Sequence, residues 1–382
     1  MTAAVGPEHG FGLYVHWPYC ARICPYCDFN VYAAKDRDTE PLVAAIIADI
    51  HAHRARLPEH PSFDSVFFGG GTPSLLSSRQ LARIIEASSD AFGLSQSVEI
   101  TLESNPNDIL RETPADWAEA GINRLSIGVQ SLRDEALSFL GRDHDGQAAR
   151  RAVEKAQSEF ENLSVDLIYA RPGQSPEAWA AELEDALRLG APHLSLYELT
   201  IEARTAFGKR AARGELTPMP DDDQADLYDL TQSICAAHDL NAYEVSNHAR
   251  GAAFESRHNH IYWASGDWIG VGPGAHGRLT MDGQRLATEA ARRPEDYLST
   301  NGPTETPLTQ LDTAREFLAM ALRPASGLSL SRFEALFGQA ADSALLDQLQ
   351  SQSLARIEDD HLKLTPQGRL MADYLAGQLS PY

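Results

Sequence analysis

Residues 14–27 read YVHWPYCARICPYC, which places three cysteines within eight positions at the spacing Cys-x3-Cys-x2-Cys. Three thiolates on one short loop can each bind a different iron of a [4Fe–4S] cubane. The fourth iron then has no protein ligand and is free to bind a small molecule. We therefore predict that Cys20, Cys24 and Cys27 hold a [4Fe–4S] cluster.

Zinc is the main alternative for these thiols. A structural zinc ion normally takes four protein ligands, usually as two pairs. The chain has one further cysteine, Cys235, in the apolar helical pattern Leu227–Ala237, where a small buried side chain is the simpler interpretation. His16 could act as a fourth ligand, but it also suits the end of a strand. Clustered cysteines in a chain without a disulfide framework also indicate a reducing compartment.

The composition excludes several classes of function. The chain has 382 residues, enough for a large core domain and a smaller appended one. With 32 basic and 54 acidic residues its net charge is -22, so nucleic acid is not an expected partner. No apolar run approaches the ~20 residues of a membrane span, and residues 1–12 do not resemble a signal peptide. We expect a cytoplasmic protein whose membrane contact, if any, is peripheral.

Apolar runs alternate with amphipathic segments along the first 200 residues. Runs apolar on both faces are typical of parallel strands covered by helices, and the segments Pro41–Arg54, Arg79–Phe92 and Glu177–Leu189 predict such helices. This order predicts an α/β fold, a partial (β/α) barrel with its function at the carboxyl ends of the strands. The predicted strands are Leu13–His16, Ser65–Phe68, Ser97–Leu102, Arg124–Val129, Leu163–Tyr169 and Leu194–Leu199.

A second, smaller domain is predicted after residue 300, so that residues 1–300 form the core and residues 301–382 a C-terminal domain. Asn301–Pro307 is rich in Pro and Thr and resembles a linker. Three helical segments follow, then a hairpin-like run at Ala355–Thr365 and a last helix, an arrangement similar to a winged helix. From Glu305 onward there are six basic and ten acidic residues, which argues against DNA binding by this domain.

Polar residues follow the predicted strands. Gly69–Pro73 reads GGGTP after the second strand, where glycines let the backbone approach a ligand closely, although a tight turn is the alternative. Glu103 and Gln130 end the third and fourth strands, and Arg142 follows in a loop; for Glu103 the alternative is an acceptor at a helix start. Asp166 lies inside an apolar strand and needs a partner or a ligand, with a structural salt bridge as the alternative.

The cysteine spacing, with the aromatic Tyr26 before the last cysteine, resembles the radical SAM family. The resemblance implies a (β/α) barrel whose open iron chelates S-adenosylmethionine through its amino and carboxylate groups. One electron from the cluster then cleaves it to a 5′-deoxyadenosyl radical, which requires a reducing electron donor. By the same resemblance, the GGGTP segment binds the amino group and Glu103 contacts the methionine or ribose moiety.

The order of segments from Tyr14 to the C-terminal domain is similar to one subfamily, which contains the oxygen-independent coproporphyrinogen III oxidases and the HemW family of heme chaperones. Two S-adenosylmethionine molecules bind in the oxidase. The segment Gly270–Gly277 resembles the subfamily's closing cofactor loop. The resemblance implies cofactor contacts at Tyr14, Tyr26, Gly70, Gly71, Thr72, Glu103, Gln130, Arg142 and Asp166.

Two features separate the relatives. The oxidase has a further cysteine two residues after the last cluster ligand, and Phe29 stands at that position here. Residues 258–263 match the HNxxYW motif of the heme chaperones, which is associated there with heme. Imidazole ligates iron, and Tyr and Trp offer flat apolar surface to a porphyrin; ordinary packing at a strand edge is the alternative. The residues so implied in heme binding are His258, Asn259, Tyr262 and Trp263.

The sequence therefore predicts a heme chaperone that passes heme to acceptor hemoproteins such as respiratory cytochromes, without coproporphyrinogen oxidase activity. Its expected cofactors are a [4Fe–4S] cluster, S-adenosylmethionine and heme. Two alternatives remain. One is the decarboxylating coproporphyrinogen III dehydrogenase, and the other is a radical SAM enzyme acting on an unrelated substrate.

Overall fold

The computed structural model describes residues 4–35, 37–300 and 302–380. Its strands run along the whole chain and form one large sheet and two small ones. The strands are β1 Phe11–Trp17, β2 Tyr19–Cys20, β3 Tyr32–Ala33, β4 Phe63–Gly70, β5 Leu94–Ser104, β6 Arg124–Gln130, β7 Leu163–Tyr169, β8 His193–Glu198, β9 Asn241–Ala242, β10 Asn247–Ala249, β11 Asp267–Val271, β12 His276–Met281, β13 Gln284–Glu289, β14 Thr304–Pro307, β15 Leu328–Ser329, β16 Ala355–Glu358 and β17 His361–Leu364.

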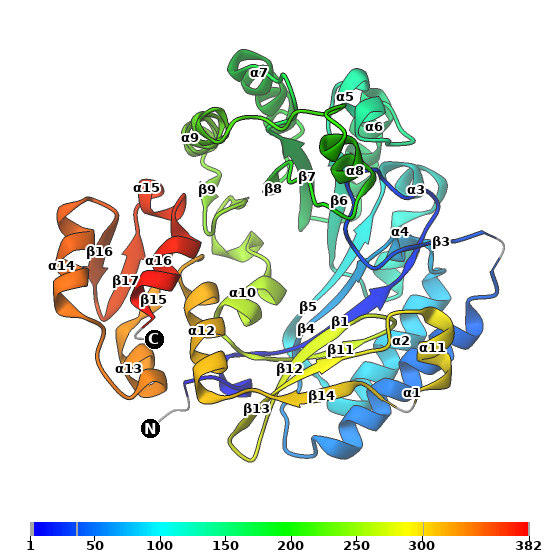
Figure 1. The fold of residues 1–382 in the computed structure, drawn as a ribbon. Coiled ribbons are helices and arrows are strands. Elements are labelled where there is room, and N and C mark those ends of the chain that lie inside the picture. The colour runs from blue at the N-terminus through cyan, green and yellow to red at the C-terminus, as the bar shows by residue number, and fades with distance from the viewer. Residues whose placement is uncertain (1–3, 36, 301, 381–382) are drawn as a thin grey trace.

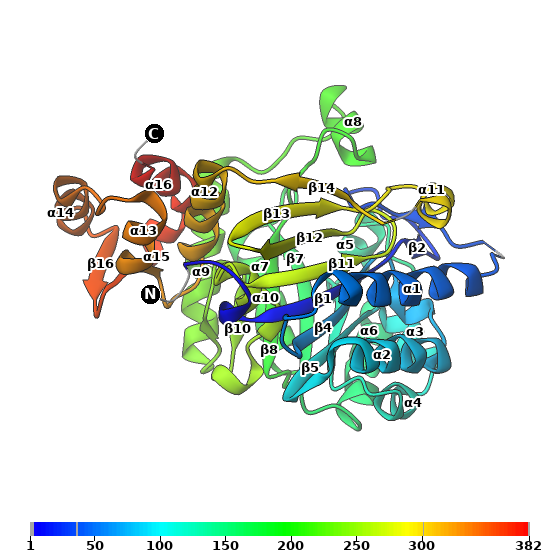
Figure 2. The same ribbon diagram turned by 90° about the horizontal axis from the view of Figure 1, so that it is seen from below.

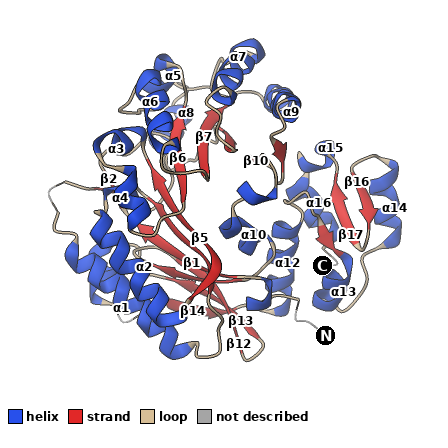
Figure 3. Ribbon diagram, turned by 180° about the vertical axis from the view of Figure 1, so that it is seen from behind, coloured by secondary structure: helices blue, strands red, loops and turns tan. Residues whose placement is uncertain are grey.

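Helices cover the outer face of the large sheet and build most of the C-terminal part (Figure 3). Within the described residues, none of them is both long and apolar enough to cross a bilayer. The helices are α1 Glu40–Arg56, α2 Ser78–Phe92, α3 Pro106–Arg111, α4 Pro114–Glu119, α5 Asp134–Phe139, α6 Gly146–Gln157, α7 Pro176–Leu187, α8 Ala206–Ala212, α9 Asp221–Ala237, α10 Arg257–Trp263, α11 Pro294–Ser299, α12 Gln310–Ala321, α13 Leu330–Phe337, α14 Ser343–Ser351, α15 Pro366–Arg369 and α16 Ala372–Leu379.

The large sheet has the strand order β14-β13-β12-β11-β1-β4-β5-β6-β7-β8-β10-β9. Its centre, from β11 through β1 and β4 to β8, is parallel, and antiparallel strands extend both ends. The sheet curves without closing (Figure 1). The prediction of an α/β partial barrel is confirmed, and all six predicted strands are present as β1 and β4–β8.

Helices α1 and α2 lie side by side on the outer face of the sheet (Figure 2). Helix α2 begins with a capping box, in which the Ser77 hydroxyl accepts from the Gln80 backbone and the Gln80 side chain accepts from Ser77 N. It ends at Gly93, whose φ of 78° suits a residue without a Cβ. These two signals set the ends of helix α2, which connects β4 to β5.

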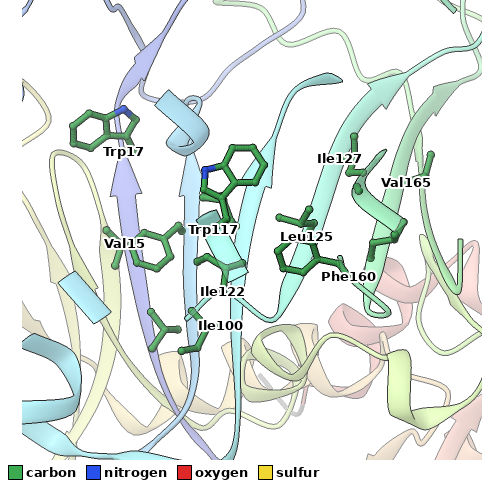
Figure 4. Packing of buried hydrophobic residues seen from close by; sticks show 14 of the residues in the cluster. Val15, Trp17, Ile100, Trp117, Ile122, Leu125, Ile127, Phe160 and Val165 are labelled. Carbon is green, nitrogen blue, oxygen red and sulfur yellow. The ribbon is translucent and has the colours of Figure 1, made fainter. Parts of the chain in front are cut away.

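The main core lies between the sheet and its outer helices. Leu125 and Ile127 of β6 and Trp117 of α4 are each no more than 1% exposed, and Figure 4 shows them among the buried side chains of the neighbouring strands. Burying apolar surface at ~25 cal/mol per Å² is the main source of stability for such a layer. The packed outer face holds the strands in place, so side chains at their carboxyl ends are fixed in position.

The C-terminal part has its own apolar cluster, which includes Phe317, Phe333 and Leu362. It contains the three-stranded sheet β15-β17-β16 and helices α12–α16. The predicted linker over 301–307 is wrong for Thr304–Pro307, because these residues form β14 and pair with β13 of the large sheet. Asn301 lies outside the described residues.

The two parts are joined by polar contacts as well as by the chain. The guanidinium of Arg332 on α13 donates to the carbonyl of Ala264, directly after α10, at 2.6 Å. Arg278 of β12 forms a bidentate ion pair with Glu316 of α12, with distances of 2.7 and 2.9 Å. Arginine–carboxylate pairs of this kind fix orientation as well as distance. Helix α10 therefore lies between the large sheet and the C-terminal part.

Candidate functional site

One cavity of about 660 Å³ opens at the carboxyl ends of the parallel strands. A volume of this size lies in the range of small-molecule and cofactor sites. Residues 258–263, considered a strand edge as one alternative, form helix α10, whose inner face also borders the cavity. The predicted residues that line it are Tyr14, Cys20, Cys24, Tyr26, Cys27, Gly70, Gly71, Thr72, Glu103, Gln130, Arg142, Asp166, His258, Asn259 and Tyr262.

Trp263 is the predicted heme residue that the structure does not bring to this cavity. Its indole is buried on the other side of α10, in a small cluster with Tyr243 and Ala249. Tyr243 lies edge-on to it, with 5.7 Å between the ring centroids. This packing holds α10 against β10, so Trp263 supports the cavity wall from behind.

The three cysteines lie on the loop after β1. Cys20 is buried at the end of β2, whereas Cys24 and Cys27 are half-buried, and the Cys27 amide donates to the Cys24 carbonyl at 3.2 Å. Burial raises the pKa of Cys20 and raises that of Cys27 to about 11. Iron binding requires thiolates, so the metal must supply the charge that stabilises them.

The three thiols border the cavity, and the fourth cysteine does not. Within the described residues, no three His, Cys, Asp or Glu side chains converge closely enough to hold a single metal. Zinc would need such convergence, with sulfur at ~2.3 Å from one ion, whereas a cubane takes each thiolate on a different iron. Cys235 is fully buried on α9 in the main apolar core, away from the cavity. Cys235 is therefore not placed to act as a fourth ligand beside the other three cysteines.

Gly70 and Glu103 connect the ends of β4 and β5. The amide of Gly70 donates to Glu103 Oε2 at 3.2 Å, and Gly70 has a φ of 104° that favours glycine. A Cβ on Gly71 would lie 2.8 Å from the carbonyl oxygens of Trp17 and Tyr19, so the GGG turn also needs its glycines for packing. Burial and the nearby Asp166 carboxylate raise the pKa of Glu103 to about 8, although the Gly70 amide opposes this.

Asp166 has no salt bridge in the part of the chain that the structure describes, although one was considered from the sequence. Its carboxylate accepts from the hydroxyls of Ser126 at 2.8 Å and Ser164 at 2.9 Å. Burial raises the pKa of Asp166, and these serines partly oppose that shift. A buried carboxylate with neutral partners suits contact with a polar or cationic ligand group.

Arg142 contacts three segments around the cavity. It donates to Cys24 Sγ at 3.3 Å, to the Gly128 carbonyl at 2.8 Å and to Asn105 Oδ1. Its Nε is buried and has no hydrogen-bond partner among the described residues. An unpaired buried donor of this kind costs stability unless a ligand supplies an acceptor. Arg142 is therefore suited to bind an anionic group beside the cysteines.

Gln130 adopts a φ of 66°, which is uncommon for a residue with a side chain. It stands at the end of β6, where the pairing with β7 shifts register between Ile127 and Gln130. Irregularities of this kind re-aim side chains at strand ends and are frequent next to functional sites. Gln130 lines the cavity as a result.

Sequence reasoning did not single out Asn30, and it considered His16 only as a possible metal ligand or strand end, whereas both residues stabilise the loop that carries the cysteines. Asn30 Nδ2 donates to the carbonyls of Pro273 at 2.9 Å and Arg292 at 2.8 Å. His16 Nε2 lies 3.0 Å from the Asn30 carbonyl oxygen, and its Nδ1 lies 3.1 Å from the Tyr14 hydroxyl. The Gly270–Gly277 segment does not line the cavity; it packs behind it, where a Cβ on Gly272 would lie 2.2 Å from the His16 carbonyl oxygen.

His258 is buried in the cavity wall and both of its ring nitrogens have partners. Nδ1 lies 2.6 Å from Ser65 Oγ and Nε2 lies 2.6 Å from the Tyr262 hydroxyl. Its ring stacks on Phe67 with a centroid distance of 5.0 Å. Burial lowers the pKa of His258 to about 3, so the imidazole is neutral near pH 7. Asn259 lies beside it on the same wall.

Two family models match the chain. The Radical SAM superfamily model matches residues 14–186, and the HemN C-terminal domain model matches residues 308–371. Among solved structures, coproporphyrinogen III oxidase (HemN) from Escherichia coli, described as a radical SAM enzyme, superposes with a TM-score of 0.80. That match covers 98% of this chain and 91% of the oxidase at 22% identity, and it shows a shared fold.

Curated relatives match almost the full length. The heme chaperones HemW of Mycobacterium tuberculosis and Bacillus subtilis are 34% and 32% identical, over 96% and 95% of this chain and 94% and 97% of their own lengths. A mitochondrial protein of Bos taurus, radical S-adenosyl methionine domain-containing protein 1, is 35% identical over 95% of this chain and 86% of its length. The chain therefore belongs to the radical SAM superfamily and, within it, to the family of these HemW proteins and their mitochondrial relatives. Membership implies S-adenosylmethionine and a [4Fe–4S] cluster as cofactors.

Proposed function

We propose that this chain is a heme chaperone, which binds heme and delivers it to acceptor hemoproteins such as respiratory cytochromes. The observation that carries the proposal is that His258, Asn259 and Tyr262 of the HNxxYW motif line the same cavity as the three cysteines. Relatives named heme chaperones support it, since they match over nearly their whole length. Heme would then lie close to the cluster and S-adenosylmethionine.

The residues of the cavity have separate tasks in this proposal. Cys20, Cys24 and Cys27 would hold the cluster, which supplies one electron to S-adenosylmethionine when both are bound. Glu103 would accept from the amino or ribose groups of the cofactor, and the unpaired Nε of Arg142 would donate to its carboxylate. The remaining predicted contacts, Tyr14, Tyr26, Gly70, Gly71, Thr72, Gln130 and Asp166, would complete the pocket.

The second candidate is a coproporphyrinogen III dehydrogenase, which the shared fold with the oxidase favours. Phe29 argues against it, because the oxidase carries a cysteine at the position that Phe29 occupies. The Phe29 side chain is 63% exposed and lines the cavity, so the thiol that distinguishes the oxidase is replaced by a large apolar surface.

We also propose that the protein acts in the cytoplasm with a reducing electron donor and without nucleic acid. All four cysteines are free thiols, which suits a reducing compartment. The net charge of -22 opposes contact with a polyphosphate.

Heme titration beside a turnover assay tests the function. Reconstituted protein is titrated anaerobically with heme, and a second sample receives coproporphyrinogen III, S-adenosylmethionine and a chemical reductant. We expect a saturable shift of the heme absorption bands and no protoporphyrinogen product. Robust turnover would establish the second candidate, and a heme spectrum identical to that of free heme would refute the chaperone.

A further inference from the structure

Three large apolar side chains are presented to the open volume of the cavity. Ile23 is 47% exposed, Phe29 is 63% exposed and Tyr197 is 44% exposed, and all three line the cavity. The other exposed large apolar residues in the described part of the chain lie elsewhere, on β16, α11, α12, α16 and the turn before α16. Exposed apolar surface gathered in a concave site is typical of a ligand seat.

The residues that line the cavity differ in chemistry. Gly70, Glu103 and Arg142 offer hydrogen-bonding groups suited to a small polar cofactor. Ile23 and Phe29 belong to the segment that carries the cysteines, one residue before Cys24 and two residues after Cys27. A polar cofactor bound by Gly70, Glu103 and Arg142 would not by its chemistry match these exposed apolar side chains.

Tyr197, on β8, is the third of these side chains, and it lines the cavity beside Asp166 and Ser195. Burial and the Asp166 carboxylate raise the pKa of Tyr197, and a hydrogen bond with Ser195 partly opposes the shift. Because the residue is 44% exposed, its aromatic surface is available to contact a flat ligand.

A cation also lines the cavity. Arg22 lies between the first two cysteines, is exposed, and lines the cavity. It forms no ion pair with another described residue, in a chain whose net charge is -22. An unpaired arginine beside aromatic surface suits a flat ligand that carries a carboxylate at its edge.

We infer that Ile23, Phe29, Tyr197 and Arg22 form the seat for the tetrapyrrole ring, with the ring against the apolar side chains and a propionate at Arg22. The inference rests on the proposed heme-binding function and goes beyond the HNxxYW motif, because it assigns ring binding to the cysteine loop and β8. A seat of this kind binds through ring contact, so it takes metal-free protoporphyrin IX as well as heme.

Titrations with protoporphyrin IX and heme test the seat. The variants are Phe29→Ser and Tyr197→Ser, with Tyr374→Ser on α16 as the matched control, because Tyr374 is 59% exposed and lies outside the cavity. We expect each cavity variant to weaken both ligands about tenfold and the control to leave them unchanged. Iron and sulfide content, with thermal unfolding, shows that cluster and fold are retained.

A second variant tests the cation. Arg22→Gln should weaken binding of protoporphyrin IX severalfold and leave binding of its dimethyl ester unchanged, because the ester lacks the propionate charge. Unchanged affinity in Phe29→Ser, Tyr197→Ser and Arg22→Gln, with normal heme binding in the wild type, would overturn the seat and spare the chaperone. Absence of heme binding in the wild type would instead refute the proposed function.

Discussion

Nε2 of His258 lies 2.6 Å from the hydroxyl oxygen of Tyr262, both within the HNxxYW motif on α10. Since Nδ1 is engaged by Ser65, the imidazole can ligate heme iron only after it gives up one of these bonds. The motif therefore holds His258 in the cavity wall with both of its ring nitrogens engaged in hydrogen bonds. Heme titration of variants at His258 and Tyr262 measures whether the imidazole gives up one of these hydrogen bonds to ligate iron.

We expect Tyr262→Phe to raise heme affinity about fivefold, because the substitution removes one competing hydrogen bond of about 1 kcal/mol. The measurement is anaerobic heme titration followed by absorption. His258→Ala should abolish the ligand-dependent shift of the heme bands and should cancel the gain when combined with Tyr262→Phe. If neither variant changes the titration, His258 is not the iron ligand.

Trp263→Ala should lower stability and leave the heme spectrum unchanged. The indole is 7% exposed and packs outside the cavity, so its removal creates a void that costs about 3–5 kcal/mol. Urea unfolding measures the loss, and heme absorption at low urea measures the site. An altered heme spectrum with unchanged unfolding would place the indole against the ligand.

The cluster should depend on three cysteines and not on the fourth. Anaerobic reconstitution should give about four irons and four sulfides per chain. Each of the variants Cys20→Ala, Cys24→Ala and Cys27→Ala should remove this iron and sulfide. The matched control is Cys235→Ala, because Cys235 is buried on α9. Loss of iron only in the control variant would overturn the assignment.

Binding of S-adenosylmethionine should strengthen as the pH rises toward 8. The Glu103 carboxyl has a pKa of about 8 in the free protein, so it is mostly protonated at pH 7. The cofactor carries a sulfonium cation and amino and hydroxyl donors, which favour the ionised carboxylate, so affinity should fall up to about tenfold for each pH unit below 8. Calorimetry at pH 6, 7 and 8 measures this trend.

Glu103→Gln is the control for that trend, since an amide does not titrate. Its affinity should be lower at pH 8 and should vary less with pH than that of the wild type. The same slope in both proteins would assign the proton to another group.

The buried side chain of His53 should make the folded protein less stable in mild acid. It is 1% exposed on α1, and burial, with Arg56 nearby, lowers its pKa to about 4. Between about pH 6.5 and 4 the unfolded chain binds a proton that the folded chain does not, so stability is full above 6.5 and falls as the pH drops, by up to ~1.4 kcal/mol per pH unit. Urea unfolding at pH 7 and 5 should show a smaller loss in His53→Gln than in the wild type.

The central strands were predictable because they are apolar on both faces. Each residue of β1 other than Tyr14 is buried, and a near-continuous apolar run of this kind has few alternatives to a covered parallel strand. The short antiparallel strands at the two ends of the sheet give no such signal. Strand β14, for example, has four exposed residues and resembles a linker in sequence, and only its pairing with β13 makes it a strand.

Contacts between segments that are distant in the sequence could not be predicted either. Asn30 is stabilised by carbonyls more than 240 positions away, and nothing in its local sequence indicates this. The direction of Trp263 also could not be predicted, because the alternative considered for residues 258–263 was a strand edge and these residues lie in helix α10. Ser256 was the available signal, since its hydroxyl accepts from Asn259 N and caps α10.

The pairing of β14 leaves the large sheet with a free edge at Thr304–Pro307. A free edge can template the addition of strands from other molecules, which begins aggregation. Pro307 lacks an amide hydrogen, and Glu305 carries a charge held by an ion pair with Arg56 of α1. Proline and charged side chains are the features by which proteins keep exposed sheet edges from pairing with other molecules, so this edge carries its own protection against edge-to-edge assembly.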